Sequence, residues 1–248
     1  MTEERLSRRG FLKAFLVATG GTMGIIAAKE IYPFTGLLSL RGKDGEVAAE
    51  DFLQLVEVSE NLPKVALNTS AFSKALLHTA AYILPENGPS RLKAVLEKKP
   101  LRVVLDPNSP GPFSWNNKLY YPSAHYTPFF FGGPEIRFFK HFLENYSAAN
   151  KNLDIASQVK NDATVWHEII HLVQDIKNPL ELSITTSLYG LRDGANSLGL
   201  IDQHNSADDP AEKEAIQKSS EIVELKFNEY LLDGKPENWP FGQFFTFG

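Results

Sequence analysis

The sequence predicts an α+β fold in which a small β-sheet packs against helices within one domain. Stretches with helical periodicity alternate with short runs of β-branched and aromatic residues, and no internal repeat or low-complexity linker divides the chain. The 248 residues, 43% of them hydrophobic and 22% charged, suffice for a buried core. We therefore expect a folded protein rather than a disordered one.

The first residues resemble a twin-arginine export signal. Paired arginines, Arg8 and Arg9, precede Phe-Leu-Lys, and an apolar, glycine-containing segment follows from Ala14 to Ala28. This segment is too short and too rich in glycine to predict a membrane span. The resemblance implies a prokaryotic protein that the twin-arginine machinery exports to the periplasm or beyond. We expect residues 1–28 to form the signal and residues 29–248 to form the domain. The signal is either cleaved or retained, and a retained signal would anchor the protein to the membrane.

Two stretches in the first half of the chain predict helices. Thr69–Leu84 places apolar side chains at helical spacing after a capping residue, Thr69 or Ser70. Pro89–Lys99 begins with a proline, which the first helical position tolerates well.

The middle of the chain predicts strands. A β-branched run between prolines indicates a strand at Pro100–Pro107, and a second short strand is expected at 118–123. Glu135–Phe142 fits a strand or a helix, and its aromatic content favours the strand. The aromatic loop Tyr126–Phe131 either lines a pocket or, as we prefer, fills the core.

The balance of residue types excludes several functions. The formal net charge is −5, and no cluster of Lys and Arg lies outside the extreme N-terminus, so no nucleic-acid partner is expected. The chain has no cysteine, which excludes disulfides, thiolate metal ligands and cysteine nucleophiles. A metal ion would have to be held by His, Asp or Glu.

One segment has the spacing of a metal site. His167 and His171 are four residues apart in a stretch of helical periodicity, so both imidazoles lie on one face, one turn apart. Neutral imidazole nitrogens suit Zn²⁺, and Glu168, directly after the first histidine, can reach a water beside the ion. An apolar stripe marks the opposite side of this helix: Trp166, Ile169, Ile170, Val173 and Ile176.

The pattern His167-Glu168-Ile169-Ile170-His171 resembles the HExxH motif of the zincin metallopeptidases. The resemblance implies that both histidines bind zinc and that Glu168 is the catalytic acid and base. The metzincin variant needs a glycine three residues and a histidine six residues after the second histidine. Those positions hold Gln174 and Lys177, so the gluzincin variant, which takes a glutamate from a later helix, fits better.

A strong later helix is predicted at Pro210–Gly234, with Asp209 as its cap and Gly234 as its stop. Glu224 borders its apolar face and is expected to be the third zinc ligand, ahead of Glu221. That face comprises Ile216, Val223, Phe227, Tyr230 and Leu231.

Other polar residues remain open for the site. Asp175, one turn beyond His171, is an alternative ligand but fits better as the partner of a histidine N–H. Asp202 and His204 are further alternatives for the ligand. His204 or Tyr189 could also stabilise an oxyanion.

The resemblance implies an exported zinc-dependent hydrolase that acts on peptides or proteins. Zinc would lower the pKa of its bound water, and Glu168 would take the water proton and deliver it to the leaving amine. Glu135–Phe142, as a strand edge, would align the substrate. The alternatives are a non-catalytic exported protein of similar fold that binds metal or peptides, and a chance motif in an interaction domain.

Overall fold

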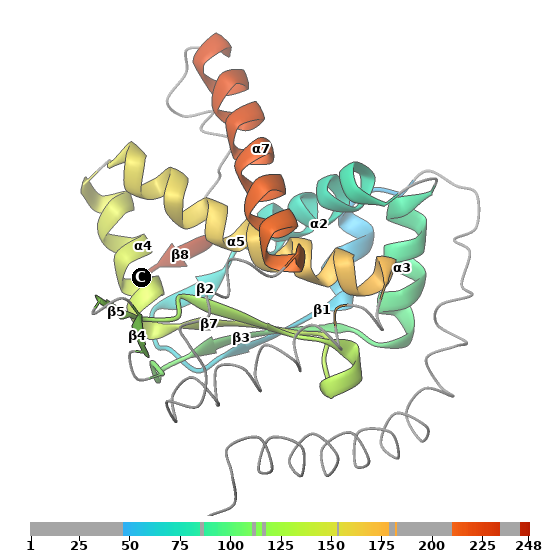
Figure 1. Cartoon of the computed structure of the whole chain (residues 1–248), viewed down its shortest axis with the longest axis horizontal. Coiled ribbons are helices and arrows are strands. Elements are labelled where there is room, and N and C mark those ends of the chain that lie inside the picture. Colours follow the sequence, from blue (N-terminus) through green and yellow to red (C-terminus); the bar gives the residue numbers. More distant parts are fainter. Residues whose placement is uncertain are drawn as a thin grey trace, which may run out of the picture.

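A four-stranded mixed sheet with helices along one face forms the frame of the protein (Figure 1). The computed structural model describes residues 47–84, 87–110, 113–115, 118–152, 154–178, 182, 210–233 and 244–248. Strands β1, β3 and β7 are parallel, and β6 closes the sheet antiparallel to β7. The strand order is β1 (Val56–Glu60), β3 (Leu101–Asp106), β7 (Glu135–Phe139) and β6 (Ala124–Thr127).

Alternating apolar residues of the two central strands form the floor of the core. Val103 and Leu105 of β3 lie beside Ile136 and Phe138 of β7 in the parallel register, and all four are fully buried. Because side chains alternate across a strand, this face is apolar, whereas Arg102 and Arg137 belong to the other face, where they pair with Glu135.

Helices that precede and follow β1 in the sequence cover part of this floor. A short 3-10 helix, η1 (Ala49–Leu55), precedes β1, and α2 (Thr69–Ile83) and α3 (Gly88–Lys98) follow it. The cap of α2 is Asn68, whose side chain accepts a hydrogen bond from the Ala71 N–H, and not Thr69 or Ser70 as the sequence suggested.

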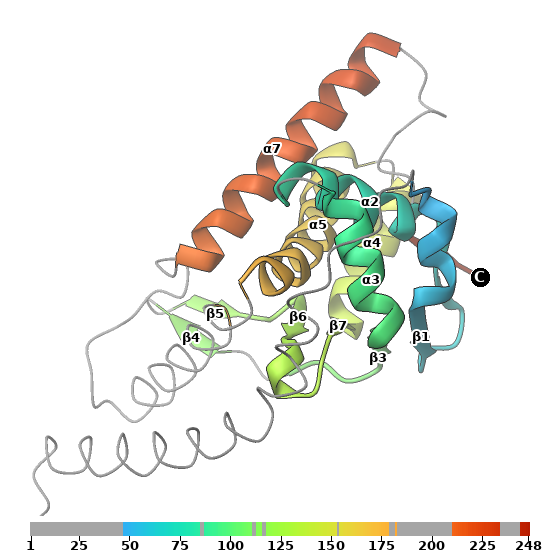
Figure 2. The same ribbon diagram turned by 90° about the vertical axis from the view of Figure 1, so that its right-hand side faces the viewer.

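Helices α4 (Lys140–Asn152), α5 (Ile155–Lys177) and α7 (Pro210–Asp233) complete the layer. Asp154 caps α5 through the Ser157 N–H. Helix α5 packs against α2, α4, α7 and β6, and its expected apolar stripe is buried. Helix α7 crosses α5 at an angle (Figure 2).

Short two-stranded pairs lie outside the main sheet. Strand β2 (Val65–Leu67) pairs with the C-terminal β8 (Phe245–Phe247), and β4 (Phe113–Trp115) pairs with β5 (Lys118–Tyr120). In the described part of the chain, no helix combines the length and apolar character needed to cross a membrane. The signal at residues 1–28 lies outside the described residues and stays a prediction.

The α+β fold with a small sheet, a histidine-bearing helix and a later glutamate-bearing helix is confirmed. The segment Glu135–Phe142 is divided: its first part is strand β7, and α4 begins at Lys140. Strand β7 is paired on both sides, with β3 and with β6, so it is interior to the sheet.

Candidate metal centre

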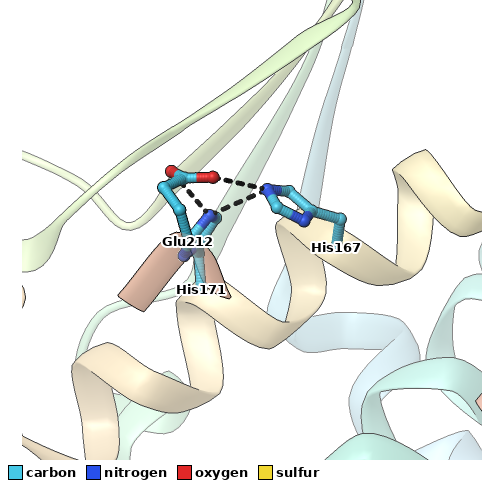
Figure 3. A group of neighbouring side chains, drawn as sticks. All are labelled: His167, His171 and Glu212. Carbon is cyan, nitrogen blue, oxygen red and sulfur yellow. Dashed lines mark hydrogen bonds and ion pairs between the residues drawn. The ribbon is translucent and has the colours of Figure 1, made fainter. Parts of the chain in front are cut away.

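Helix α5 presents two imidazoles to each other across one turn (Figure 3). The Nε2 atoms of His167 and His171 lie 3.0 Å apart, and the rings are nearly perpendicular with centroids 4.6 Å apart. Residues four apart share a helix face, and the apolar stripe on the other side fixes which face that is. The His171 side chain is 8% exposed and the His167 side chain 20%, so the pair is largely withdrawn from solvent.

A carboxylate from α7 completes the cluster. Glu212 Oε2 lies 3.2 Å from His167 Nε2, and Glu212 Oε1 lies 3.2 Å from His171 Nε2. One donor atom from each of the three residues can be chosen so that all lie within 4.8 Å of one another. Glu212 is in the first turn of α7, where the partial positive charge of the helix N-terminus stabilises a carboxylate. These residues form a His-His-Glu group able to hold a metal ion.

The structure brings Glu212, and not Glu224, to the histidines. Glu224 is exposed, and α7 buries Ala215, Ser219 and Ile222 together with Val223, which the sequence had placed on the apolar face. Ile216, which we assigned to the apolar face, is 46% exposed. Glu212 lies three residues before Ala215, in the first turn of α7, and belongs to the same contact face. It is therefore placed over α5.

Glu221, the second expected ligand, has another role. Its carboxylate accepts hydrogen bonds from Tyr82 of α2 (2.6 Å) and from Lys218 (2.8 Å). These donors, Lys218 foremost, lower the pKa of Glu221 to about 2. Glu221 therefore joins α7 to α2 and holds the helix whose first turn carries Glu212.

The three side chains together favour a positive charge at the point where they meet. Burial lowers the pKa of His171, but the hydrogen bond and charge of Glu212 outweigh burial and raise it to about 9. Burial raises the pKa of Glu212, but both imidazoles pull it well below its ordinary value. A divalent cation at this point would supply the positive charge while both imidazoles stay neutral.

A cavity of about 200 Å³ opens beside the three residues. Glu168, only 6% exposed, lines this cavity together with the cluster and with Tyr126 of the edge strand β6. Within the described part of the chain, the Glu168 carboxylate takes part in no hydrogen bond or ion pair. The cavity thus brings a group able to hold a metal ion and the Glu168 carboxylate to the same space.

Gln174, and not Asp175, contacts the second nitrogen of a histidine. Gln174 Oε1 lies 2.8 Å from His171 Nδ1. Asp175 Oδ2 instead accepts hydrogen bonds from the Tyr126 hydroxyl (2.8 Å) and the Phe129 N–H (2.7 Å). Asp175 therefore attaches α5 to β6, and Tyr126 stacks on the His171 ring at a centroid distance of 6.5 Å.

The remaining candidates, Tyr189, Asp202 and His204, lie outside the described residues, so their roles stay predictions. Sequence reasoning found both histidines and Glu168. It missed Glu212, whose only sequence signal is its place in the first turn of a well-capped helix.

Comparisons of the chain with known protein families, with curated proteins and with solved structures find no match. The functional assignment therefore depends on the chemistry of the site itself.

Replacing Glu212 by Gln should weaken zinc binding, because the variant loses a negatively charged ligand atom. The loss should exceed the roughly 10- to 100-fold that usually follows when a ligand loses only its hydrogen-bond partner. Glu224→Gln, on the same helix, is the matched control and should bind zinc as the wild type does. Competitive titration against a chromophoric chelator measures both affinities. Equal losses in the two variants, or none in either, would remove Glu212 from the site.

Asp175 should make stability depend on pH. Burial raises its pKa to about 6, and the hydrogen bonds from Phe129 and Tyr126 only partly oppose this. A carboxyl whose pKa is raised in the folded state favours folding most at low pH, and this contribution is lost as the pH rises through 6. Asp175→Asn lacks this titration. Its unfolding free energy relative to wild type should therefore increase by on the order of 2 kcal/mol between pH 4 and pH 7.

Urea unfolding of both metal-free proteins across this pH range measures the difference. A constant difference between variant and wild type would mean that Asp175 titrates normally.

Proposed function

We propose that the protein is an exported zinc-dependent hydrolase of the zincin type that cleaves peptide bonds. The observation that carries the proposal is the convergence of His167, His171 and Glu212 beside a cavity that Glu168 also lines. Donor atoms on one tetrahedral zinc ion, each about 2.0–2.1 Å from it, lie about 3.3 Å apart. The two Nε2 atoms lie 3.0 Å apart, close to this spacing, and each lies 3.2 Å from a different oxygen of Glu212, so the carboxylate faces both imidazoles.

The chemistry of the donors also suits zinc. Two neutral imidazoles and one carboxylate are the ligand set of many catalytic zinc sites, which leave a further position open. A structural zinc site is closed by four protein ligands, and the described residues supply three. His204 and Asp202, which lie outside the described residues, are the candidates that would close the site as a fourth ligand, and we take the site to be open.

Each residue has a distinct role in the proposed reaction. His167, His171 and Glu212 would hold the ion, which when bound supplies Lewis acidity toward a carbonyl and toward water. Glu168 would accept a proton from the attacking water and later donate it to the leaving amine. Glu168 lines the same cavity as the three residues that would hold the ion, which supports this role.

The substrate strand would pair with β6 and not with β7. Strand β7 has neighbours on both sides, whereas β6 is at the edge of the sheet and lines the cavity. An extended peptide can add to an exposed edge through backbone hydrogen bonds, with alternate side chains pointing into pockets. The contact of Asp175 with Tyr126 fixes this edge relative to α5, and hence relative to the zinc ligands.

Glu168→Gln should retain zinc and lose hydrolysis, because an amide cannot accept the water proton. General-base catalysis is typically worth about 10²- to 10⁴-fold in rate, and the loss should fall in this range. Cleavage of a fluorogenic peptide library, with bound zinc measured in parallel, tests this. Glu144→Gln on the exposed side of α4 is the control and should be fully active.

Chelation should abolish cleavage in the wild type, and added zinc should restore it. Wild-type turnover in Glu168→Gln would exclude Glu168 from the chemistry. A zinc-loaded wild type that cleaves nothing in the library would instead favour the alternative, an exported protein that binds metal or peptides without catalysis.

Export would depend on the paired arginines of the N-terminal segment. Replacing Arg8 and Arg9 by Lys should leave the protein in the cytoplasm, because the twin-arginine machinery requires the pair that residues 7–13 resemble. Fractionation of cells that express either form locates the protein. Equal export of the two forms would mean that the segment is not such a signal.

A further inference from the structure

Gln174 lies between a proposed zinc ligand and the helix that carries another. Its Oε1 is 2.8 Å from His171 Nδ1, and its Nε2 is 3.1 Å from the carbonyl oxygen of Ala211 and 3.0 Å from Glu214 Oε2. Gln174 is 6% exposed. Ala211 directly precedes Glu212, so this single amide contacts His171 on α5 and the backbone next to Glu212 on α7.

The neighbours on α7 fix which way the amide points. A carbonyl oxygen and a carboxylate only accept hydrogen bonds, so the Gln174 atom that faces them must be the NH₂ group. The reversed amide would place its oxygen, which cannot donate, against two other oxygens at about 3 Å. The oxygen of the amide must therefore face His171.

The amide in turn fixes the proton on the histidine. Because Gln174 Oε1 can only accept, His171 Nδ1 must carry a hydrogen. In the neutral ring this leaves Nε2 with its lone pair, and Nε2 is the atom that faces His167 and Glu212. The orientation of His171 as a ligand thus depends on acceptors located on α7.

We propose that Gln174 is a positioning residue that sets the Nδ1–H tautomer of His171 and ties it to the backbone beside Glu212, so that two zinc ligands are aligned by one side chain. This inference rests on the proposed metal site. It extends that site to Glu214, whose carboxylate holds the amide and also receives Lys177 Nζ at 3.4 Å on the exposed side.

Zinc affinity of a set of folded variants tests the proposal. Gln174→Leu removes all three hydrogen bonds of the amide and should weaken zinc binding by about 10- to 100-fold, the usual effect of losing a ligand's partner. The double variant Gln174→Glu with Glu214→Gln exchanges donor and acceptor. Its carboxylate accepts from His171 Nδ1 and from the amide at position 214 but cannot donate to the Ala211 carbonyl, so the affinity should recover only in part, to at least about 3-fold above that of Gln174→Leu.

Lys177→Gln is the control, because Lys177 contacts Glu214 but not His171, and it should bind zinc normally. Long-range ¹H–¹⁵N spectra of the zinc-loaded proteins give a second readout. The His171 Nδ1–H resonance should be protected from exchange with water in the wild type and the double variant, and it should broaden or disappear in Gln174→Leu.

Wild-type affinity in Gln174→Leu would overturn the proposal. A double variant that binds zinc as weakly as Gln174→Leu would also overturn it, since position 174 would then matter for packing alone. If Gln174→Leu does not fold, the double variant still decides between these outcomes by its own affinity and its Nδ1–H resonance. Failure of the wild type to bind zinc would reject the metal site itself, which is a different result from either.

Discussion

The crossing of α5 by the first turn of α7 is the contact on which the site depends. Polar links hold it: Glu212 contacts both histidines, Gln174 donates to Ala211 and Glu214, and Lys177 also contacts Glu214. Farther along α7, Glu221 accepts from Tyr82 of α2. Two imidazole nitrogens and a carboxylate at 3.0–3.2 Å require a positive charge between them. A bound metal ion would supply that charge, and because metal binding to a folded site contributes on the order of 10 kcal/mol, it would also hold the helices together.

The other side of α5 places the edge strand. Asp175 is fully buried and accepts hydrogen bonds from Tyr126 and the Phe129 N–H, and Tyr126 stacks on His171. A buried carboxylate is expensive unless it is hydrogen-bonded, and here these two bonds set the distance between β6 and the histidines. Helix α5 therefore buries polar residues on two sides, which explains why its burial extends beyond the apolar stripe.

Local periodicity was enough to predict part of this structure, and tertiary contacts decided the rest. His167, Glu168 and His171 follow from the 3.6-residue repeat, and α7 follows from its terminal signals. The choice of Glu212 depends on where two helices cross, which no repeat within either helix encodes. Ile216, assigned to the apolar face, is 46% exposed, and the expected ligand Glu224 lies three turns along α7 from Glu212. Likewise, one helical step separates Gln174 from Asp175, and only the position of α7 decides which of them contacts His171.

The state of Glu168 bears on whether the site is catalytic. Its carboxylate is 6% exposed, and within the described part of the chain it takes part in no hydrogen bond or ion pair. Glu168 lines the cavity rather than being sealed in the core, and a purely structural metal site does not need a carboxylate at this position. A general base, in contrast, must be close to the reacting water and must not be neutralised by a permanent partner. Glu168 shares one cavity with the three residues that could hold a metal ion, so the hydrolase proposal depends on a carboxylate and a metal site facing the same space.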